Sequence, residues 1–375
     1  MAPRFSCKVT VPKAKNPGTQ INQTVLLVRQ SFVSDILDAD GNCAKDAGED
    51  IRLWADAAFT IPMPRHVKKI IKNNNPALGT LQIYTLYASF PSGDDPECWA
   101  TWGDPGATEP APDSAFGQYN AYDSKCKGVW HFEESCNGTT DESKEATENQ
   151  NHGTGGGGDS SKAPTLVDAT IDKALDYDGT NDFLNCGTDS SLDINGENYV
   201  LRLIITPHTL AASGSSGQSV FLVKGEAFVG GYYIQHSTGG KFLFTSSAPT
   251  IDQTYAALNT LVVDETALWH VVREGSGSSN VTIYKNGVEV TYSSRGTHAA
   301  IASTSDPLEF GRYLHDTSQY HADAIIEQAL VYIDGVFNAN KCVTENNNLM
   351  DAANFAYPGP LVFLYNGRVN PIIID

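Results

Sequence analysis

Two glutamates occupy positions where a charged side chain is unexpected, and their chemistry is that of cation ligands. Glu134 shares a face with Trp130 if residues 129–134 form a strand. Glu327 stands inside the apolar run Ile325–Tyr332. A carboxylate on a core-facing position is costly unless a cation or a full set of hydrogen bonds compensates its charge. Both glutamates are therefore candidate metal ligands.

The polar segment from Asp141 to Thr154 supplies further oxygen atoms, Asp141 and Asn151 among them. Calcium prefers hard oxygen ligands from carboxylates, amides and carbonyls. We therefore expect one structural Ca²⁺ site made of Glu134, Asp141, Asn151 and Glu327. The alternative is that backbone amides and water satisfy the two glutamates.

Motifs for hydrolysis are absent from the sequence. Glycosidases with a β-sandwich fold carry Glu-x-Asp-x-x-Glu on one strand, and no Glu-x-Asp occurs here. There is also no Gly-x-Ser-x-Gly elbow and no His-Glu-x-x-His. Ser92–Trp99 is similar to a sialidase Asp box, but it stands alone and has Pro96 where that box has glycine. We therefore expect a protein that is not an enzyme.

Two segments combine aromatic rings with planar polar groups, as sugar recognition requires. They are Arg312–His321 and Gly230–Tyr233. The candidate glycan-binding residues are Tyr232, Tyr313, His315, Asp316 and Tyr320. The alternative is that these tyrosines pack between loops.

Composition disfavours two classes of partner. The chain has 375 residues and a formal net charge of −19 at pH 7. Such a charge repels the phosphates of nucleic acids and anionic lipids. No apolar stretch approaches the ~20 residues of a membrane span. We expect neither nucleic-acid binding nor membrane insertion, and the length favours two domains.

Short alternating runs between turn residues predict β-structure. Val281–Lys285 and Val288–Tyr292 each alternate, and Asn286-Gly287 stands between them. Asn-Gly in this place predicts a hairpin with a type I′ turn, because both central residues need positive φ. The pattern favours an all-β sandwich or barrel. Further strand candidates are residues 25–28, 50–56, 81–88, 99–103, 221–223, 232–235, 241–244 and 308–311.

Four blocks follow one another in a fixed order. They are Trp130–Glu134, Ala174–Phe183, Leu268–Arg273 running on to Ile283–Gly287, and Ile326–Tyr332. Together they resemble the laminin-G-like, concanavalin-type jelly roll. The resemblance implies a two-sheet β-sandwich that is usually a binding module. It also implies an oxygen-rich loop at 141–154, although Asp-Glu is commoner in that family than Glu327-Gln328.

Three motifs precede these blocks. They are Gly48–Leu53, the turn Trp102–Ala107, and Ala115-Phe116 leading to Gly128–Phe132. They resemble a domain of unknown function that often precedes laminin-G-like domains in bacterial surface proteins and phage virion proteins. The resemblance covers most of residues 5–126.

The end of the chain is apolar. Leu361–Leu364 and Ile372–Ile374 flank Asn366-Gly367, which is a hairpin signal. Such a hairpin needs a sheet edge, either in this chain or in a neighbouring subunit by β-augmentation. We expect residues 341–375 to form a C-terminal extension that supports assembly.

We therefore predict two β-sandwich domains, residues 1–126 and 127–340, the second a concanavalin-type (laminin-G-like) jelly roll. The predicted function is that of a non-enzymatic structural or adhesive surface protein with glycan binding. A phage virion component is favoured, either a capsid decoration or a protein of the tail or fibre, because the sequence after Met1 lacks a signal peptide's apolar core. Expected partners are other virion proteins or further copies in a homo-oligomer, and cell-surface glycans. The alternatives are a secreted bacterial adhesin or carbohydrate-binding module and, less favoured, a glycoside hydrolase.

Overall fold

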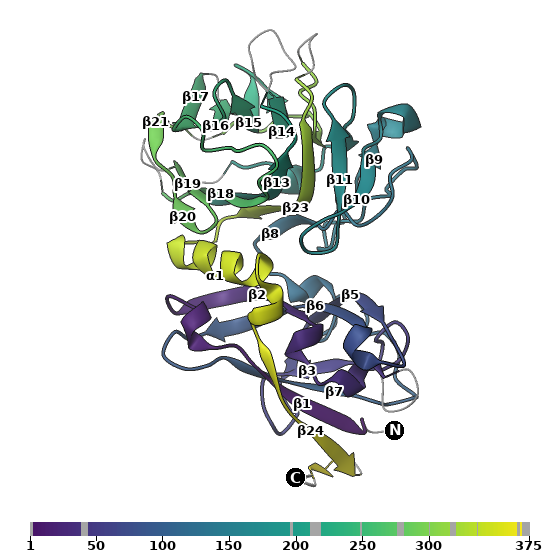
Figure 1. Cartoon of the computed structure of the whole chain (residues 1–375). Coiled ribbons are helices and arrows are strands. Elements are labelled where there is room, and N and C mark those ends of the chain that lie inside the picture. The colour runs from purple at the N-terminus through teal and green to yellow at the C-terminus, as the bar shows by residue number, and fades with distance from the viewer. Residues whose placement is uncertain are drawn as a thin grey trace. The chain divides into compact units, whose positions relative to one another are not determined.

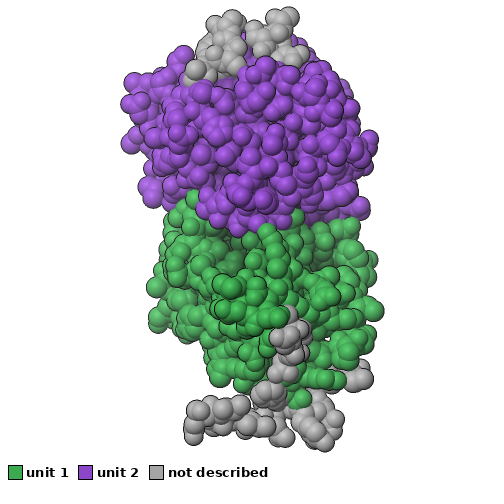
Figure 2. Space-filling model, turned by 45° about the vertical axis from the view of Figure 1, so that its right-hand side comes forward, with its two compact units in different colours: residues 1–124, 343–375 green, residues 125–342 purple. Residues whose placement is uncertain are grey.

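The chain forms two compact units, coloured separately in Figure 2. Unit 1 comprises residues 1–124 and 343–375, and unit 2 comprises residues 125–342. Strands dominate both units (Figure 1), so the predicted all-β class is confirmed. The computed structural model describes residues 3–38, 44–195, 198–210, 219–247, 250–275, 281–299, 301–315, 320–335, 337–365 and 368–369.

Unit 1 is a sandwich of two antiparallel sheets with one core between them. The larger sheet has the order β25 (Arg368–Val369), β24 (Tyr357–Tyr365), β1 (Phe5–Thr10), β7 (Glu97–Trp102), β3 (Arg52–Trp54) and β4 (Pro62–Met63). The smaller sheet has the order β2 (Gln20–Val28), β6 (Thr80–Phe90) and β5 (Arg65–Ile71). Apolar side chains of both sheets, such as Val25, Ile83 and Trp102, belong to one buried cluster. The four strand candidates of this region lie in or overlap β2, β3, β6 and β7.

Unit 2 is a larger antiparallel sandwich of the jelly-roll type. One sheet has the order β10 (Thr165–Asp168), β11 (Lys173–Asp178), β23 (Asp323–Ile333), β13 (Tyr199–Pro207), β18 (Ala267–Arg273), β19 (Val281–Lys285) and β20 (Val288–Glu289), and β8 (Cys126–Trp130) also pairs with β23. The other has the order β21 (Tyr292–Ser294), β17 (Ile251–Ala256), β16 (Lys241–Ser247), β15 (Gly230–Ser237), β14 (Ser219–Glu226), β22 (Leu308–Phe310), β12 (Leu184–Asn185) and β9 (Thr154–Gly155). Trp269 and Phe242 stack between the sheets with ring centroids 4.2 Å apart. Their contact joins β18 of one sheet to β16 of the other.

The predicted hairpin between β19 and β20 is present. Asn286 and Gly287 have φ of 51° and 76°, so both central residues adopt the left-handed conformation of a type I′ turn. The Asn286 Oδ1 atom also accepts the Leu268 N–H at 2.9 Å. The turn therefore fixes β19 against β18 as well as against β20.

The C-terminal segment differs from the expected separate extension, because residues 343–375 belong to unit 1. Strand β24 pairs with β1, which puts Leu361 opposite Cys7. Phe355 is fully buried in the unit 1 core and stacks on Phe90. The apolar side chains that suggested a neighbouring subunit thus lie, as far as the structure describes them, against their own chain; Ile372–Ile374 lie outside the described residues.

A helix that no apolar period indicated precedes this strand. The helix is α1 (Ala339–Leu349), and its Asn348 side chain contacts the edge strand β2. The Oδ1 atom accepts the Leu26 N–H and the Nδ2 atom donates to the Leu26 carbonyl oxygen, both at 2.8 Å. The side-chain amide of Asn348 therefore replaces a missing strand partner for β2.

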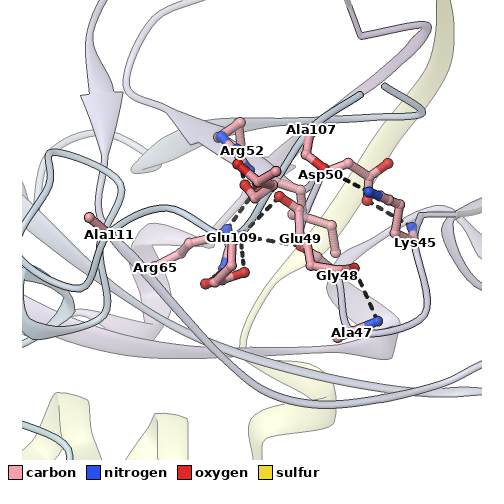
Figure 3. A network of polar contacts seen from close by, with 12 residues as sticks. Lys45, Ala47, Gly48, Glu49, Asp50, Arg52, Arg65, Ala107, Glu109 and Ala111 are labelled. Atoms are coloured by element: carbon pink, nitrogen blue, oxygen red, sulfur yellow. Dashed lines mark hydrogen bonds and ion pairs between the residues drawn. The ribbon is translucent and has the colours of Figure 1, made fainter. Parts of the chain in front are cut away.

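The buried guanidinium of Arg65 joins the motif Gly48–Leu53 to Glu109, in the Pro-rich segment 104–113 that follows β7 (Figure 3). Its Nε donates to the Ile51 carbonyl oxygen at 2.6 Å, and its Nη atoms donate to the Glu109 carboxylate at 3.1 and 3.0 Å. Asp50 adds a second link, since its carboxylate accepts the N–H groups of Lys45 and Gly103, each at 2.7 Å. The Pro-rich segment after β7 is thereby tied to the loop before β3.

We predict that the substitution Phe355→Ala destabilises unit 1 by about 3–5 kcal/mol, because it opens a cavity in the core. Chemical denaturation followed by fluorescence measures the change. The matched control is Tyr357→Ala, because Tyr357 is 48% exposed and its loss should cost far less. Equal, small effects of both substitutions would show that the C-terminal segment is not part of the core.

Candidate functional site

A polar hollow of about 240 Å³ lies in unit 2 between two loops. One loop precedes β9 and the other follows β12. The lining residues are Asp141, Gln150, Asn151, His152, Thr154, Asn185, Cys186, Gly187, Thr188 and Asp189. Nearly all of them carry amide, hydroxyl, carboxylate or imidazole groups, so the hollow is suited to a ligand with many hydrogen-bonding groups.

The carboxylate of Glu142 holds the beginning of the first loop. It accepts the backbone N–H groups of Asn137 at 2.7 Å, Gly138 at 3.0 Å and Thr139 at 3.1 Å. It also accepts the N–H of Gly155 at 2.9 Å. One side chain therefore fixes the chain before the hollow to β9 on its far side.

The carboxylate of Glu145 holds the rest of the loop from beneath. Its Oε1 accepts the N–H groups of Val129 and Thr147 at 2.8 and 2.7 Å. Its Oε2 accepts the Thr147 hydroxyl at 2.9 Å and the Asn151 N–H at 3.3 Å. The residue is 2% exposed, and burial raises the pKa of its carboxyl group although the hydrogen bonds oppose that shift.

The imidazole of His152 has a defined hydrogen-bonding state in this loop. Its Nδ1 atom lies 3.0 Å from the backbone nitrogen of Glu145. A backbone N–H can only donate, so Nδ1 is the acceptor and the neutral ring carries its proton on Nε2. Burial lowers the pKa of His152, which favours this neutral form.

The second wall of the hollow depends on an ion pair behind it. Asn185 donates from Nδ2 to Glu309 at 3.1 Å and accepts the Gly187 N–H at 2.9 Å. Glu309 is 1% exposed and is paired with Arg312, whose Nη2 lies 2.6 Å from its Oε1. The pair orients the amide of Asn185, because a buried carboxylate bound to a guanidinium cannot rotate freely.

Asp189 ends this wall and begins a short 3₁₀ helix, Ser190–Leu192. Its Oδ1 accepts the Ser191 N–H at 2.8 Å, and that hydrogen bond lowers the pKa of the carboxyl group. Asp189 therefore stays ionised and fixed in direction at neutral pH.

The structure does not bring the four predicted calcium ligands into one site. Asp141 and Asn151 line the hollow, whereas Glu134 and Glu327 do not. The strand expected to carry Glu134 ends at Trp130, and Phe132 has a φ of 51° that breaks the alternation. Glu134 is consequently half-buried rather than in the core, and it accepts the Lys144 N–H at 3.4 Å.

Glu327 is buried as expected but has a different role. It lies at a β-bulge, because Ile326 and Gln328 face successive residues of β13 and Glu327 faces none. Its carboxylate accepts N–H groups from the turn Thr170–Asp172, that of Ile171 among them. It borders a separate hollow of about 350 Å³. Glu327 therefore fits the alternative stated for these glutamates, in which backbone amides satisfy the carboxylate.

Among the residues that the structure describes, no three His, Cys, Asp or Glu side chains gather in a way that could hold a metal ion. Glu134 and Glu327 already accept backbone N–H groups, and Glu327 borders a different hollow from Asp141 and Asn151. The predicted Ca²⁺ site is therefore not assembled by Glu134, Asp141, Asn151 and Glu327.

The predicted glycan-binding tyrosines lie outside the hollow. Tyr232 is 1% exposed and its hydroxyl donates to the Leu192 carbonyl oxygen at 2.9 Å, so its assignment to a glycan site was wrong. Tyr313 packs edge-on against Tyr233 and stacks with Tyr320, which is 8% exposed. Tyr313 and Tyr320 therefore fit the alternative, in which the tyrosines pack against one another between loops.

His315 and Asp316 are the other two residues that were predicted to bind a glycan. His315 lies with Nε2 3.1 Å from Asp306 Oδ1, which engages its ring in the chain's own contacts. Asp316 lies outside the described residues.

Most residues that organise the hollow were not singled out in the sequence. Glu142, Glu145 and Glu309 touch backbone or other side chains rather than a ligand. The sequence could have indicated Glu142 and Glu145 by their position inside a long Asn-, Thr- and Gly-rich loop. Such a loop has many backbone N–H groups that need acceptors. Glu309 stands in an apolar strand and gives a weaker signal of the same kind.

No family model matches the chain, and no curated protein matches it. Solved structures similar to it include domain 4 of AbnA, an extracellular GH43 arabinanase from Geobacillus stearothermophilus, in complex with arabinotriose. That match has 14% identity and a TM-score of 0.43, and covers 59% of this chain and 98% of that one.

Two further structural matches are weaker in coverage or in TM-score. The binding domain of Paraclostridial Mosquitocidal Protein 1 has 12% identity and a TM-score of 0.45, covering 59% of this chain and 51% of that one. The CBM40 of the Ruminococcus gnavus IT-sialidase, bound to α2,3 sialyllactose, has 10% identity and a TM-score of 0.34, covering 48% and 96%. Similarities this distant do not identify a function. None of the helices in the described part of the chain has the length and apolar character of a membrane span.

We predict that Glu145→Gln destabilises the protein by about 3 kcal/mol, because an amide cannot accept all four hydrogen bonds. The raised pKa adds a pH dependence. The contribution of Glu145 to the free energy of unfolding is fully present below its unfolded pKa of about 4.5 and decreases as pH rises through the folded pKa. The difference in the free energy of unfolding between the unmodified protein and Glu145→Gln should thus be larger at pH 4.5 than at pH 8.

Thermal denaturation across this pH range measures the effect. The control is Glu148→Gln, an exposed position in the same loop. A Glu145→Gln protein as stable as the control would contradict the role assigned to this carboxylate.

Proposed function

We propose that unit 2 is a non-enzymatic glycan-binding module and that the polar hollow is its binding site. The observation that carries the proposal is a hollow lined by planar amides and hydroxyls, in which the buried carboxylates of Glu145 and Glu309 hold Asn151 and Asn185 in place. Sugars present many hydroxyl groups, and planar amides can bridge pairs of them. Gln150 supplies such an amide. Asn151 can offer its amide oxygen, because its Nδ2 already donates twice, and Asn185 can offer one remaining amide hydrogen.

Rigidity supports this proposal. A ligand pays less ordering free energy when the groups that contact it are already fixed. The Asn151 side chain is 5% exposed and donates to the Lys127 carbonyl oxygen at 3.1 Å and the Ser191 hydroxyl at 3.0 Å. Asn185 is fixed through Glu309, as described above. The hollow therefore presents preorganised groups rather than mobile surface side chains.

The carboxylates of the hollow favour binding over hydrolysis. A glycosidase needs a carboxylic acid with a raised pKa to protonate the leaving group. The pKa of Asp189 is lowered instead, so it is a poor general acid. Glu145, beneath the hollow, does have a raised pKa, but its two oxygens already accept four hydrogen bonds.

We predict that unit 2, in the full chain, binds members of a broad glycan array and leaves them intact. The variants Gln150→Asn and Thr188→Ala shorten or remove single hydrogen-bonding groups, and each should weaken binding about fivefold. Asn tolerates the left-handed conformation of residue 150, whose φ is 53°, so the fold should be kept. Isothermal titration calorimetry measures the affinities, and chromatography checks the glycans for cleavage.

The control is Glu148→Gln in the same loop, outside the lining of the hollow. No binding to any glycan, or binding unchanged by both lining variants, would reject the hollow as the site. Cleavage that a single carboxylate substitution abolishes would show instead that the protein is an enzyme.

We further propose that the chain is a structural or adhesive surface protein, with a phage virion surface as its location and other virion proteins or its own copies as partners. The order of the jelly-roll blocks and of the motifs before them supports this proposal. Mass spectrometry of purified particles should detect the chain in constant stoichiometry with the coat proteins. Its absence from particles, together with its presence on bacterial surfaces, would favour the secreted adhesin.

A further inference from the structure

We infer that the hollow selects a glycan bearing an ammonium group, as in a sugar with a free amine, over neutral and anionic glycans. This inference rests on the proposed glycan binding and adds the chemical class of the ligand. It follows from the charges that line the hollow. Asp141 and Asp189 contribute carboxylates and His152 contributes a neutral imidazole. Among the residues that the structure describes, no lysine or arginine belongs to the lining.

The two aspartates are placed mainly by backbone conformation and hydrogen bonds, although the charge of Lys224 also contributes to the lowered pKa of Asp189. Asp189 Oδ1 accepts the Ser191 N–H, so its charge is held at the start of a 3₁₀ helix. Asp141 adopts a φ of 58°, and its own N–H donates to Thr154 Oγ1 at 3.1 Å across the loop. Both residues are exposed, so a ligand in the hollow can approach them.

Lys144 of the same loop lies near the hollow, and its charge contributes to the lowered pKa of His152. It offsets part of the two carboxylate charges, but one lysine outside the lining leaves the described lining with a net negative charge. Lys144 donates from Nζ to the Asp141 carbonyl oxygen at 2.6 Å and is absent from the lining. An ammonium group on the ligand therefore gains attraction, whereas a carboxylate on the ligand meets repulsion.

The chain permits a matched neutral variant, the double substitution D141N/D189N. Asn begins helices as well as Asp does, because its side-chain oxygen also accepts the first free N–H groups. Asn also tolerates the left-handed conformation of residue 141. The variant should thus keep the shape of the hollow and lose only its charge.

The test compares two matched pairs of sugars by calorimetry with the full chain. Chitosan tetrasaccharide, with free amines, is compared with chitin tetrasaccharide, in which they are acetylated. Lactose is compared with sialyllactose. We expect chitosan tetrasaccharide to bind about fivefold more tightly than its acetylated form, which is the size of one to two exposed charge interactions. We expect sialyllactose to bind more weakly than lactose.

In D141N/D189N the affinity ratio of chitosan to chitin tetrasaccharide and that of lactose to sialyllactose should both fall to about one. Added salt should lower both ratios in the same way for the unmodified protein. Equal affinities within both pairs for the unmodified protein would overturn the inference while leaving glycan binding in place. A preference that persists in D141N/D189N would also overturn it. Failure of every sugar to bind would reject the proposed function itself, so the two failures are distinguishable.

Discussion

Buried carboxylates that accept backbone N–H groups are the interaction on which the loops of this protein depend. Strands satisfy their own amides by pairing, but a long loop leaves many donors that must find another acceptor. A carboxylate has two oxygens and can accept several N–H groups at once. Buried Glu145 and Glu327 do this in unit 2, and buried Asp50 does it in unit 1. The half-buried Glu142 does the same in unit 2.

This use of carboxylates has consequences for the hollow in unit 2. The first loop is held at both ends by Glu142 and from beneath by Glu145, so its outward groups need no further fixation. The carboxylates of Glu142 and Glu145 accept hydrogen bonds from the chain itself, whereas Asp141 and Asp189 remain exposed to a ligand. The site can thus be rigid and locally acidic together, which is the basis for both the proposed glycan binding and the proposed ligand class.

The strands could be predicted from the sequence because their signals are local. Alternation in Val281–Lys285 and the Asn286-Gly287 turn depend on neighbouring residues, and both hold in the structure. The second predicted run, Val288–Tyr292, forms a strand of this sheet only at Val288 and Glu289. The side of the sheet that a residue faces was harder to predict. Tyr232 and Tyr233 are adjacent and face opposite sides of β15, and no local pattern indicates which of them lies in the core between the sheets. The choice depends on the register of β15 with its neighbours, which is a long-range property.

The candidate site was predictable only in part, for the same reason. Asp141 and Asn151 were identified because they lie in an oxygen-rich loop. Glu134 was misplaced because the left-handed Phe132 ends the regular alternation two residues earlier. The role of the C-terminal segment was also non-local, since pairing of β24 with β1 joins residues more than 300 positions apart. Alternation within the tail predicts a strand and cannot name its partner.

Amide hydrogen exchange in the loop before β9 tests the central claim most directly. If Glu142 and Glu145 hold this loop, the amides of Thr147, Asn151 and Gly155 should exchange as slowly as amides paired in the strands. The amide of exposed Glu148 serves as the internal reference for fast exchange. Exchange of the other three amides at the rate of Glu148 would contradict the account, because the carboxylates would then not be holding the loop.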